Sequence, residues 1–413
     1  MKIALVNNYY YLRGGAERVL FGDQVALSAL GHEVRPFAHQ DDRNNTSTSD
    51  IYFPTSSSYS TAQGTGLLKA AIDVVYSRSA GQAFAAFLDD FHPDVVHCHN
   101  IYGRLTTAIL DEARRREIPV VMTVHDLKLV CPAYQGLRQG KPCQLCRDGG
   151  YWRCVRWKCH KNSRSASIVY AAESYFNRFG GKYDSIMRFL CPSLFMQQAL
   201  IDAGISEERT TYHANALAVD DYVPQYEPGE YVLYVGRLSA EKGILTLVRA
   251  LAEAKIPLHI AGTGPLEPEI RTLIAECNPS VTMEGFCEGP RLAALYRNAA
   301  FTVVPSEWYE NASMSALESL AYGKAVLAAD IGGNPELVIE GEVGRLFPSG
   351  NCERLIEVAR EMWSNRLDLS RMGRRGRLLV ERKFNQTQRA SELISMYGEV
   401  CDHAVHPHVV SVL

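Results

Sequence analysis

Short apolar segments alternate with longer amphipathic stretches along most of the chain. In the N-terminal half, the apolar segments have the length of buried strands, and stretches such as residues 16–30 have the period of a helix. Alternating strands and helices are typical of a parallel sheet. The strands predicted in this half are residues 2–6, 95–97, 119–124, 185–190 and 210–213, and the further helices are residues 106–116 and one capped by Ser193.

A second alternating series follows residues 218–230, which are rich in proline and acidic side chains and have no apolar period. We predict that this segment links an N-terminal domain, residues 1–217, to a C-terminal domain, residues 231–385. A helix at residues 386–402 is expected to pack back on the N-terminal domain, and the polar residues 44–66 to form a long loop. The strands predicted in the second series are residues 231–235, 257–261, 281–283, 301–304 and 325–328.

The predicted fold class is therefore α/β, with two doubly wound domains that face a central cleft, because ligands bind such sheets at the carboxyl ends of their strands. A length of 413 residues exceeds one ordinary core, and 46% hydrophobic with 22% charged residues is typical of a globular protein. We identify no export signal in this sequence, and it contains no run of about 18 apolar residues. We expect a cytoplasmic protein without a membrane span.

Positive charge is concentrated in one part of the chain. Residues 138–188 carry eleven Lys or Arg against three acidic residues, although the net charge of the whole chain is −3. This segment either faces an anionic partner, such as a membrane surface or a phosphorylated acceptor, or is a solvated basic face. The first interpretation places the protein peripherally at the inner face of the cell membrane. We expect no nucleic-acid partner.

Two cations follow the first strand of the C-terminal series. The segment GRLSAEKG at residues 236–243 places Arg237 and Lys242 between that strand and the next helix. A guanidinium fork, an ammonium group and a helix N-terminus together suit a diphosphate. Surface cations would have the same spacing, so this motif alone leaves both interpretations open.

Further candidates also lie at the ends of predicted strands. Glu310 would meet a ligand at the start of a helix, and Glu318, about two turns further in, would accept hydrogen bonds from a ribose. Each position alone has an ordinary structural explanation, but the shared place at strand ends in both domains favours a ligand site. The other candidates are Gly264, Gly14 and Gly15, where glycine allows close approach to the backbone, and His125, which ends a buried strand.

With these motifs the sequence resembles the retaining nucleotide-sugar glycosyltransferases of family 4, whose fold is called GT-B. The resemblance covers nearly the whole chain, and residues 305–338 are its most specific part. The matching segments are the loop at Gly14 and Gly15, TVH at 123–125, GRLSAEKG at 236–243, GTGP at 262–265, PSEWYENASMSALESLAYGKAV at 305–326 and GGNPELV at 332–338.

The resemblance implies that the chain binds a UDP- or GDP-linked sugar. Arg237 and Lys242 would neutralise the diphosphate of this donor, Glu310 would bind sugar hydroxyls and Glu318 would hold the ribose. His125 would contact the transferred sugar. The acceptor would be a glycan or a lipid-linked oligosaccharide of surface polysaccharide synthesis.

The resemblance also implies donor contacts from glycines and backbone amides. Gly14 and Gly15 would lie beside the diphosphate, and the segment Asn311, Ala312 and Ser313 would orient the donor. Family members commonly carry glycine where this chain has Ser313, so the backbone approach to the donor, and with it the sugar preference, is expected to differ.

The implied chemistry is retention of the anomeric configuration without a protein nucleophile. The leaving diphosphate would help to deprotonate the attacking hydroxyl, and the protein would supply electrostatics and positioning. The chain contains no Asp-x-Asp sequence. We therefore predict catalysis without a divalent cation or other cofactor.

Five cysteines between residues 131 and 159 form the least generic feature of the chain. The spacing of Cys143, Cys146, Cys154 and Cys159 is typical of a four-thiolate structural zinc site. Free or redox-active thiols and an iron-sulfur cluster remain alternatives. The cysteine segment has two interpretations: it is an acceptor-binding or membrane-facing platform, or it is a structural brace. Alternative zinc ligands are Cys131 and His160, and nearby cations are Arg153, Arg156 and Lys158.

Other functions are weighed against this interpretation. A dinucleotide-dependent oxidoreductase would have G-x-G-x-x-G after the first strand, which this chain lacks. A non-enzymatic two-lobed binding protein would not need the two cations and two glutamates together. A nucleotide-sugar epimerase or a glycosyl phosphorylase on the same architecture remains the alternative to a transferase.

Overall fold

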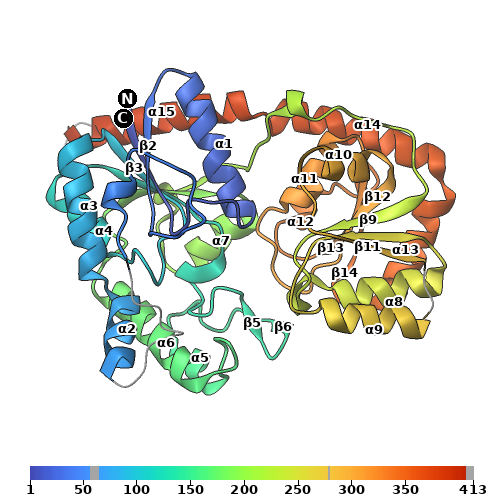
Figure 1. The fold of residues 1–413 in the computed structure, drawn as a ribbon, viewed down its shortest axis with the longest axis horizontal. Helices are drawn as coiled ribbons and strands as arrows, with labels where there is room; N and C mark the ends of the chain where they lie inside the picture. The colour runs from blue at the N-terminus through green and yellow to red at the C-terminus, as the bar shows by residue number, and fades with distance from the viewer. Residues whose placement is uncertain (56–64, 278–279, 406–413) are drawn as a thin grey trace. The chain divides into compact units, whose positions relative to one another are not determined.

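The computed structural model describes residues 1–55, 65–277 and 280–405, which form two compact units. Unit 1 comprises residues 1–139, 143–213 and the chain from residue 387, and unit 2 comprises residues 140–142 and 214–386. Each unit is built on one six-stranded sheet (Figure 1), and the paired strands of both sheets are parallel. The predicted fold class, two α/β domains with parallel sheets, is confirmed.

The sheet of unit 1 has the strand order β2-β1-β3-β4-β7-β8. Its central strands are fully buried because helices cover both faces, as their uninterrupted apolar sequences predict. The apolar pattern does not predict β2, which contains Arg35 and Pro36; proline is tolerated because β2 is an edge strand. The strands are β1 Lys2–Val6, β2 Glu33–Phe37, β3 Val95–Cys98, β4 Val120–Thr123, β7 Ile186–Cys191 and β8 Thr210–Tyr212.

Helices of unit 1 pack on this sheet through an aromatic core. Phe37, Phe84, Phe87 and Phe91 are fully buried, and the rings of Phe37 and Phe84 meet edge to face at 4.8 Å. The predicted cap at Ser193 is confirmed, since its hydroxyl accepts a hydrogen bond from the Met196 amide. The helices are α1 Gly15–Ala29, α2 Thr65–Val75, α3 Arg78–Phe91, α4 Ala108–Arg115, α5 Trp152–Arg156, α6 Arg164–Phe179, α7 Leu194–Asp202 and α15 Gln386–Val405.

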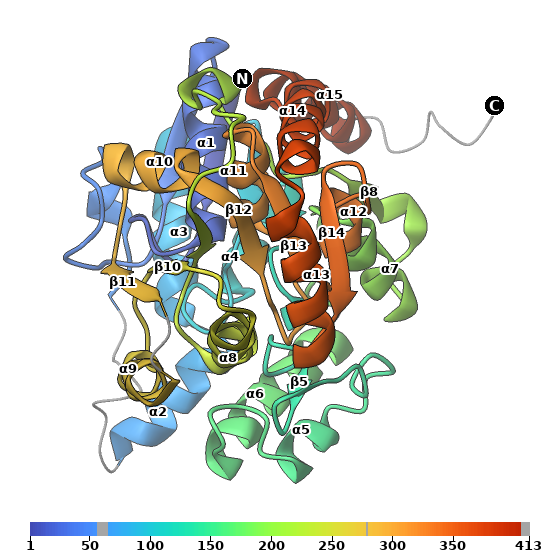
Figure 2. The ribbon, with the colours of Figure 1, turned by 90° about the vertical axis from the view of Figure 1, so that its right-hand side faces the viewer.

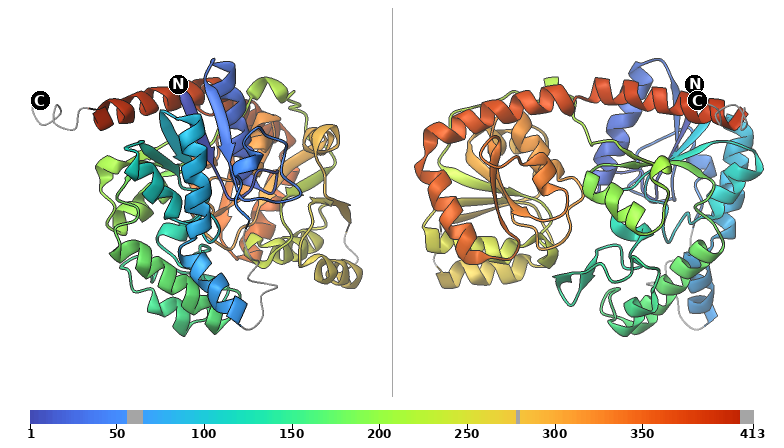
Figure 3. Two further views of the ribbon diagram at one scale, coloured as in Figure 1. Left: turned by 60° about the vertical axis from the view of Figure 1, so that its left-hand side comes forward. Right: turned by 180° about the vertical axis from the view of Figure 1, so that it is seen from behind.

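Several connections of unit 1 contain short elements. The predicted loop at 44–66 contains a 3-10 helix, Asp50–Tyr52, and ends where α2 begins, while residues 56–64 lie outside the described part. Strands β5 Leu137–Arg138 and β6 Lys141–Pro142 form a small hairpin, preceded by the 3-10 helix Leu127–Leu129. In the chain, α15 follows the last helix of unit 2. From residue 387 on, it belongs to unit 1 and runs along it (Figure 3).

The sheet of unit 2 has the strand order β11-β10-β9-β12-β13-β14. All five predicted strands form, each starting within two residues of the predicted position. Strand β14 is not predicted, since its sequence GRLFP lacks an apolar run; it lies at the sheet edge. The strands are β9 Tyr231–Val235, β10 Leu258–Ala261, β11 Val281–Gly285, β12 Ala299–Val304, β13 Ala325–Asp330 and β14 Gly344–Pro348.

Helices cover both faces of the second sheet. Figure 2 shows α8 and α13 together on one face, and α11 packs against α14 on the other. Apolar side chains from both layers bury the strands and form the core of the unit. The helices are α8 Ile244–Ala254, α9 Glu267–Cys277, α10 Gly289–Arg297, α11 Met314–Ala321, α12 Asn334–Leu337, α13 Cys352–Ser364 and α14 Arg366–Lys383.

Residues 218–230, predicted as a linker, are fastened to unit 2 at several points. Val219 is buried in its core, and Tyr222 packs against that core. Further along, the amides of Gln225 and Gly229 donate hydrogen bonds to the carbonyls of Tyr322 and Ala299. In the described part of the chain, no helix is long and apolar enough to cross a membrane.

Candidate functional site

The strand order of each sheet indicates where a ligand would bind. In unit 2 the chain leaves β9 toward β10 on one side and later returns to β12 on the other, so the connections diverge between β9 and β12. Ligands of doubly wound sheets bind at the carboxyl ends of the strands at such a point. The segment after β9 carries Arg237 and Lys242, and the segment after β12 carries Glu310.

Lys242 and Glu310 meet at this position in unit 2. The Lys242 ammonium lies 2.6 Å from Glu310 Oε1, and the same oxygen accepts hydrogen bonds from the Ser306 hydroxyl at 2.6 Å and the Trp308 indole at 2.8 Å. The Lys242 ammonium also lies 4.8 Å from the centre of the Trp308 ring. No described donor reaches the second oxygen, Oε2, so the carboxylate keeps one acceptor for a ligand.

Opposing effects set the pKa of Glu310. Burial of this carboxyl, which is 7% exposed, raises its pKa, but the Lys242 charge and the hydrogen bonds from Lys242, Ser306 and Trp308 outweigh burial. The pKa therefore lies below its usual value, and Glu310 is ionised at neutral pH. Ser306 and Trp308 are hydrogen-bond partners of Glu310 that the sequence reasoning missed, although both lie within four residues of it.

Arg237 is an exposed cation without an ion-pair partner in the described part of the chain. Its carbonyl accepts a hydrogen bond from the Tyr234 hydroxyl at 2.8 Å, which fixes the backbone of this turn. Lys242 ends a 3-10 helix, Ala240–Lys242, and Gly243 follows with φ +67°; a Cβ there would lie 1.9 Å from the Pro305 carbonyl. The turn thus presents a guanidinium that no described carboxylate neutralises.

Gly264 has a reason within the fold to be glycine. A Cβ at this position would lie 2.4 Å from the carbonyl oxygen of Leu238, and the Leu238 amide donates to the Thr263 carbonyl. The loop after β10 therefore packs directly on the Arg237 turn. Its glycine serves this packing, and a ligand contact at Gly264 stays a prediction.

The helix start after Glu310 is also built by local contacts. Ser313 is the N-cap of α11, and its hydroxyl accepts a hydrogen bond from the Ala316 amide. This gives the serine a structural role, while donor contacts of the half-buried Asn311 and Ala312 stay predictions. The Glu310 carbonyl accepts from the Gly333 amide at 2.7 Å, a contact that the sequence did not indicate.

Glu318 lies deeper than Glu310, on α11. Its side chain is buried, and Oε2 accepts a hydrogen bond from the Tyr296 hydroxyl at 2.9 Å. Tyr296, fully buried on α10, thereby orients the carboxylate. This anchoring fits a fixed hydrogen-bond acceptor, and the ribose contact stays a prediction.

In unit 1 the connections diverge between β1 and β3. Gly14 is the N-cap of α1, which starts at Gly15 after β1, and both glycines are exposed. The backbone at Gly14 is extended, and an added Cβ would have only an ordinary contact, 3.7 Å from Glu17 Oε2. The described chain thus gives no steric reason for glycine at Gly14.

Three histidines form a row at the ends of β3 and β4 in unit 1. His125 Nε2 and His99 Nδ1 share a hydrogen bond of 2.8 Å, and the rings of His97 and His99 are 4.5 Å apart. Both ring nitrogens of His97 are engaged, one by the Tyr397 hydroxyl at 2.7 Å and the other by the Thr123 hydroxyl at 2.8 Å. The predicted site residue His125 is therefore hydrogen-bonded to His99, whose ring packs on the buried His97.

Burial keeps these histidines neutral. Desolvation lowers the pKa of His97 and of His125 to about 3, and it lowers the pKa of His99 well below its usual value. The Nε2 atom of His99 is buried and has no hydrogen-bond partner in the described part of the chain. Asp23 lies close enough to His97 and His99 for the three side chains to bind one metal ion. Its carboxylate, however, already forms an ion pair with the Arg389 guanidinium.

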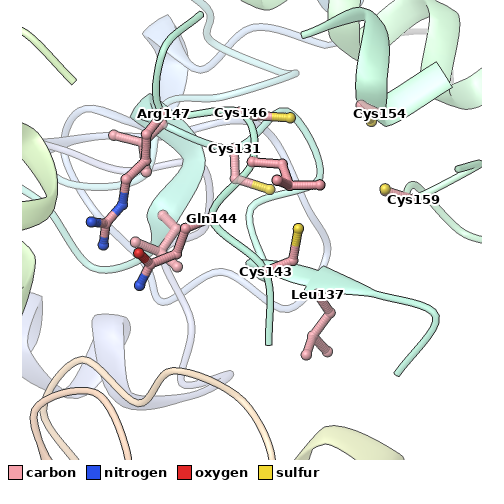
Figure 4. A pocket seen from close by; sticks show the side chains of 11 residues that line it. Cys131, Leu137, Cys143, Gln144, Cys146, Arg147, Cys154 and Cys159 are labelled. Carbon is pink, nitrogen blue, oxygen red and sulfur yellow. The ribbon is translucent and has the colours of Figure 1, made fainter. Parts of the chain in front are cut away.

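The five cysteines of residues 131–159 line one cavity in unit 1 (Figure 4). Burial is the main cause that raises the pKa of Cys131 to about 11 and of Cys146 to about 12, and neighbouring cysteines add to it. His160, the alternative zinc ligand, does not line this cavity; its ring stacks on Tyr170 at 3.9 Å.

Acidic side chains outside the basic segment neutralise part of its charge. Arg147 pairs with Asp202, and Lys182 pairs with Asp111. Within the segment, Arg153 pairs with Asp148. The exposed cations of the segment that form no ion pair in the described part of the chain are Lys141, Arg156, Lys158, Lys161, Arg164 and Arg178.

The two doubly wound units have the fold of GT-B glycosyltransferases. Residues 13–220 match the family profile described as Glycosyltransferase Family 4, and residues 222–379 match the profile described as Glycosyl transferases group 1. The chain belongs to glycosyltransferase family 4.

One relative matches most of the chain in sequence, and two solved structures share its fold. Alpha-maltose-1-phosphate synthase of Mycobacterium tuberculosis is 27% identical over 331 residues, 74% of this chain and 79% of that protein. Sucrose-phosphate synthase of Thermosynechococcus elongatus has the same fold, with a TM-score of 0.71, 20% identity, and coverage of 97% of this chain and 98% of that one. HepE of Anabaena, solved in complex with UDP, has a TM-score of 0.68 at 16% identity and covers 97% of this chain and 100% of its own.

Proposed function

We propose that this glycosyltransferase transfers a sugar from a UDP- or GDP-linked donor to a glycan or lipid-linked acceptor with retention of anomeric configuration. The observation that carries the proposal is the group of charges at the β9 and β12 strand ends. Among the residues that the structure describes, no carboxylate pairs with Arg237, and the Lys242 ammonium pairs with an ionised Glu310. A nucleotide diphosphate sugar supplies both the anion and the hydroxyls that such a site would bind.

Each group of this site has a distinct task in the proposal. The Arg237 guanidinium binds phosphate oxygens as a fork, and the Lys242 ammonium stabilises the negative charge that develops on the leaving diphosphate. Glu310 Oε2 accepts a hydrogen bond from a sugar hydroxyl, while its Oε1 stays bound to Lys242, Ser306 and Trp308. The UDP in the HepE complex supports a nucleotide-linked donor.

The state of Glu310 supports retention without a covalent intermediate. The Lys242 charge and the three hydrogen bonds to Oε1 withdraw electron density from the whole carboxylate and make it a weak nucleophile, and in the proposal Oε2 accepts a hydrogen bond from a sugar hydroxyl. In the proposed mechanism the leaving diphosphate takes the proton of the attacking hydroxyl on the same face of the sugar. Nuclear magnetic resonance of the product tests the retention of anomeric configuration, and an inverted anomeric centre would contradict the proposal.

The apolar surface of α5 and α6 supports a membrane-bound acceptor. Trp152 is 58% exposed and Phe179 is 81% exposed, and the exposed cations Arg156 and Lys158 follow Trp152 closely in sequence. Aromatic and basic side chains of this kind bind the interface of anionic membranes. We therefore propose that unit 1 binds such membranes peripherally, close to a lipid-linked acceptor.

Vesicle co-sedimentation tests the membrane proposal. Wild type is expected to bind anionic phospholipid vesicles, and the Trp152→Ser/Phe179→Ser variant to lose most of this binding. Leu367→Ser is the matched control, because Leu367 is 86% exposed on α14 of unit 2. Equal binding of all three proteins, or none by wild type, would contradict the proposal.

Donor binding is the first test of the transferase itself. Calorimetric titration with UDP- and GDP-sugars is expected to detect one donor class with wild type, and at least tenfold weaker binding by Arg237→Ala and Glu310→Ala. Arg271→Ala, an exposed arginine on α9 paired with Glu267, is the control and should bind as wild type. If wild type binds no nucleotide sugar, the proposal fails at its first step.

Product analysis separates the proposal from its alternative. A transferase gives a glycoside only when acceptor is present, an epimerase changes the donor without acceptor, and a phosphorylase needs inorganic phosphate. Activity is expected to persist in EDTA, since charges of the protein replace a divalent cation at the diphosphate. Because a structural zinc site is predicted in the cysteine segment, the zinc content of the protein is measured in parallel. The incubation is kept short enough that this content stays constant.

A further inference from the structure

Five cysteines of unit 1, separated by up to 28 positions, surround one cavity (Figure 4). They come from three parts of the chain. Cys131 follows the 3-10 helix Leu127–Leu129, Cys143 and Cys146 follow β6, and Cys154 and Cys159 lie on α5 and just after it. All five are free thiols. This cluster is not part of the site at the strand ends, and the proposed sugar transfer does not use it.

The lining of the cavity suits a thiophilic metal ion. Its other walls include the apolar side chains of Leu127, Val130 and Leu137, and none of its described lining residues is a carboxylate. Gln144 and Arg147 also line it, and Arg147 forms an ion pair with Asp202. Soft thiolate ligands select zinc, copper(I) or iron-sulfur clusters, whereas magnesium and calcium require oxygen ligands. Two cysteine pairs, Cys143 with Cys146 and Cys154 with Cys159, also have spacings close to those of structural zinc sites.

We propose that this cavity binds one Zn²⁺ through four of its five cysteine thiolates. Zinc is tetrahedral with Zn–S bonds of about 2.3 Å, so its ligand sulfurs are about 3.8 Å apart. In the described structure no three of the five sulfurs lie within 4.8 Å of one another. Binding therefore draws the sulfurs together by side-chain rotation, and the fifth thiol stays outside the coordination sphere.

Such a metal would brace the segment that follows β4. Leu127 and Val130 line the cavity and are buried, and they lie two to five residues after His125. The segment between the cysteines is short of regular structure and of apolar side chains, so bound zinc contributes the stability that a core would otherwise give. The importance of this bracing for His125 rests on the proposed function, whereas the metal site itself does not.

Metal analysis of purified full-length protein tests the proposal. Wild type from zinc-supplemented cultures is expected to contain about one zinc per chain, and the Cys143→Ser/Cys146→Ser variant less than a tenth of that. Cys352→Ser, a half-buried cysteine in unit 2, is the matched control and should retain the metal. Wild type without zinc, zinc retained by the double variant, or the visible absorption of an iron-sulfur cluster would each overturn the proposal.

A second measurement covers the case in which the double variant fails to fold. Wild type stripped of metal and loaded with Co²⁺ is expected to show the absorption bands of a tetrahedral thiolate site, and added Zn²⁺ should abolish them. A spectrum typical of six oxygen or nitrogen ligands would contradict the assignment. Neither readout depends on sugar transfer, so a failure of the proposed function leaves this test unaffected.

Discussion

At the scale of single residues, Glu310 has both a structural and a proposed functional role. Glu310→Gln keeps the shape of the side chain but removes the charge that pairs with Lys242. We expect the free energy of unfolding to fall by about 1–3 kcal/mol at pH 7, because the buried hydrogen bonds to a charged carboxylate become weaker hydrogen bonds to a neutral amide oxygen. Urea unfolding of wild type and variant measures this difference; equal stabilities would contradict the role of the pair.

The pH dependence of this difference follows from the pKa of Glu310. The folded-state pKa lies below the usual value of 4.5, so the stabilisation is present above pH 4.5 and is lost as pH falls through the folded pKa. The wild type and Glu310→Gln curves should therefore converge below pH 4.5. A gap that stays constant down to pH 3 would show that the carboxylate charge does not contribute.

Two glycines allow packing and ligand contact to be separated. Gly14→Ala is expected to change stability by less than about 1 kcal/mol, since the new Cβ meets only Glu17 at 3.7 Å. It should weaken donor binding tenfold or more if the diphosphate lies beside Gly14. Gly264→Ala should instead destabilise the protein by about 1–3 kcal/mol, because its Cβ would lie 2.4 Å from Leu238. Thermal unfolding and donor titration measure both effects.

At the scale of elements, the ends of β3 and β4 make unit 1 sensitive to acid. Folding lowers the pKa of His97 from 6.5 to about 3. As pH falls below 6.5, the unfolded chain therefore binds a proton at this residue that the folded chain does not bind, and the free energy of unfolding decreases. At pH 5 this one side chain lowers the free energy of unfolding by about 2 kcal/mol. The stability gap between wild type and His97→Gln should shrink by that amount from pH 7 to pH 5. An unchanged gap in chemical unfolding would contradict a neutral, buried His97.

Other elements depend on position in the sheet more than on their own sequence. Strands β2 and β14 form although their sequences contain proline, arginine or glycine, because each pairs with an apolar neighbour at a sheet edge. The central strands and most strand starts follow from sequence, since a strand buried on both faces must be apolar throughout.

At the scale of the whole molecule, α15 belongs to unit 1 although it follows unit 2 in the chain. Arg389 on this helix pairs with Asp23 on α1, and both side chains are buried. Arg389→Met should destabilise unit 1 by about 3–5 kcal/mol, because it leaves the Asp23 carboxyl buried and unpaired. The Asp23→Leu/Arg389→Met double variant should recover much of that loss. Chemical unfolding measures both, and a double variant less stable than the single one would contradict this account.

Sequence by itself determined the α/β class, the two series of parallel strands and the strand-end place of Arg237, Lys242, Glu310 and His125. These follow from local causes, since the apolar period sets each element and the chain order sets which residues follow each strand. Roles implied for these residues by the family resemblance stay predictions.

Tertiary structure alone decided which of these residues are partners. Lys242 and Glu310, 68 positions apart, form an ion pair because β9 and β12 are neighbours in the sheet. His97 reaches Tyr397, 300 positions away, only because α15 packs on unit 1. The folding of residues 127–159 brings the five cysteines around one cavity. Pairings of this kind depend on strand order and long-range packing, which no local pattern encodes.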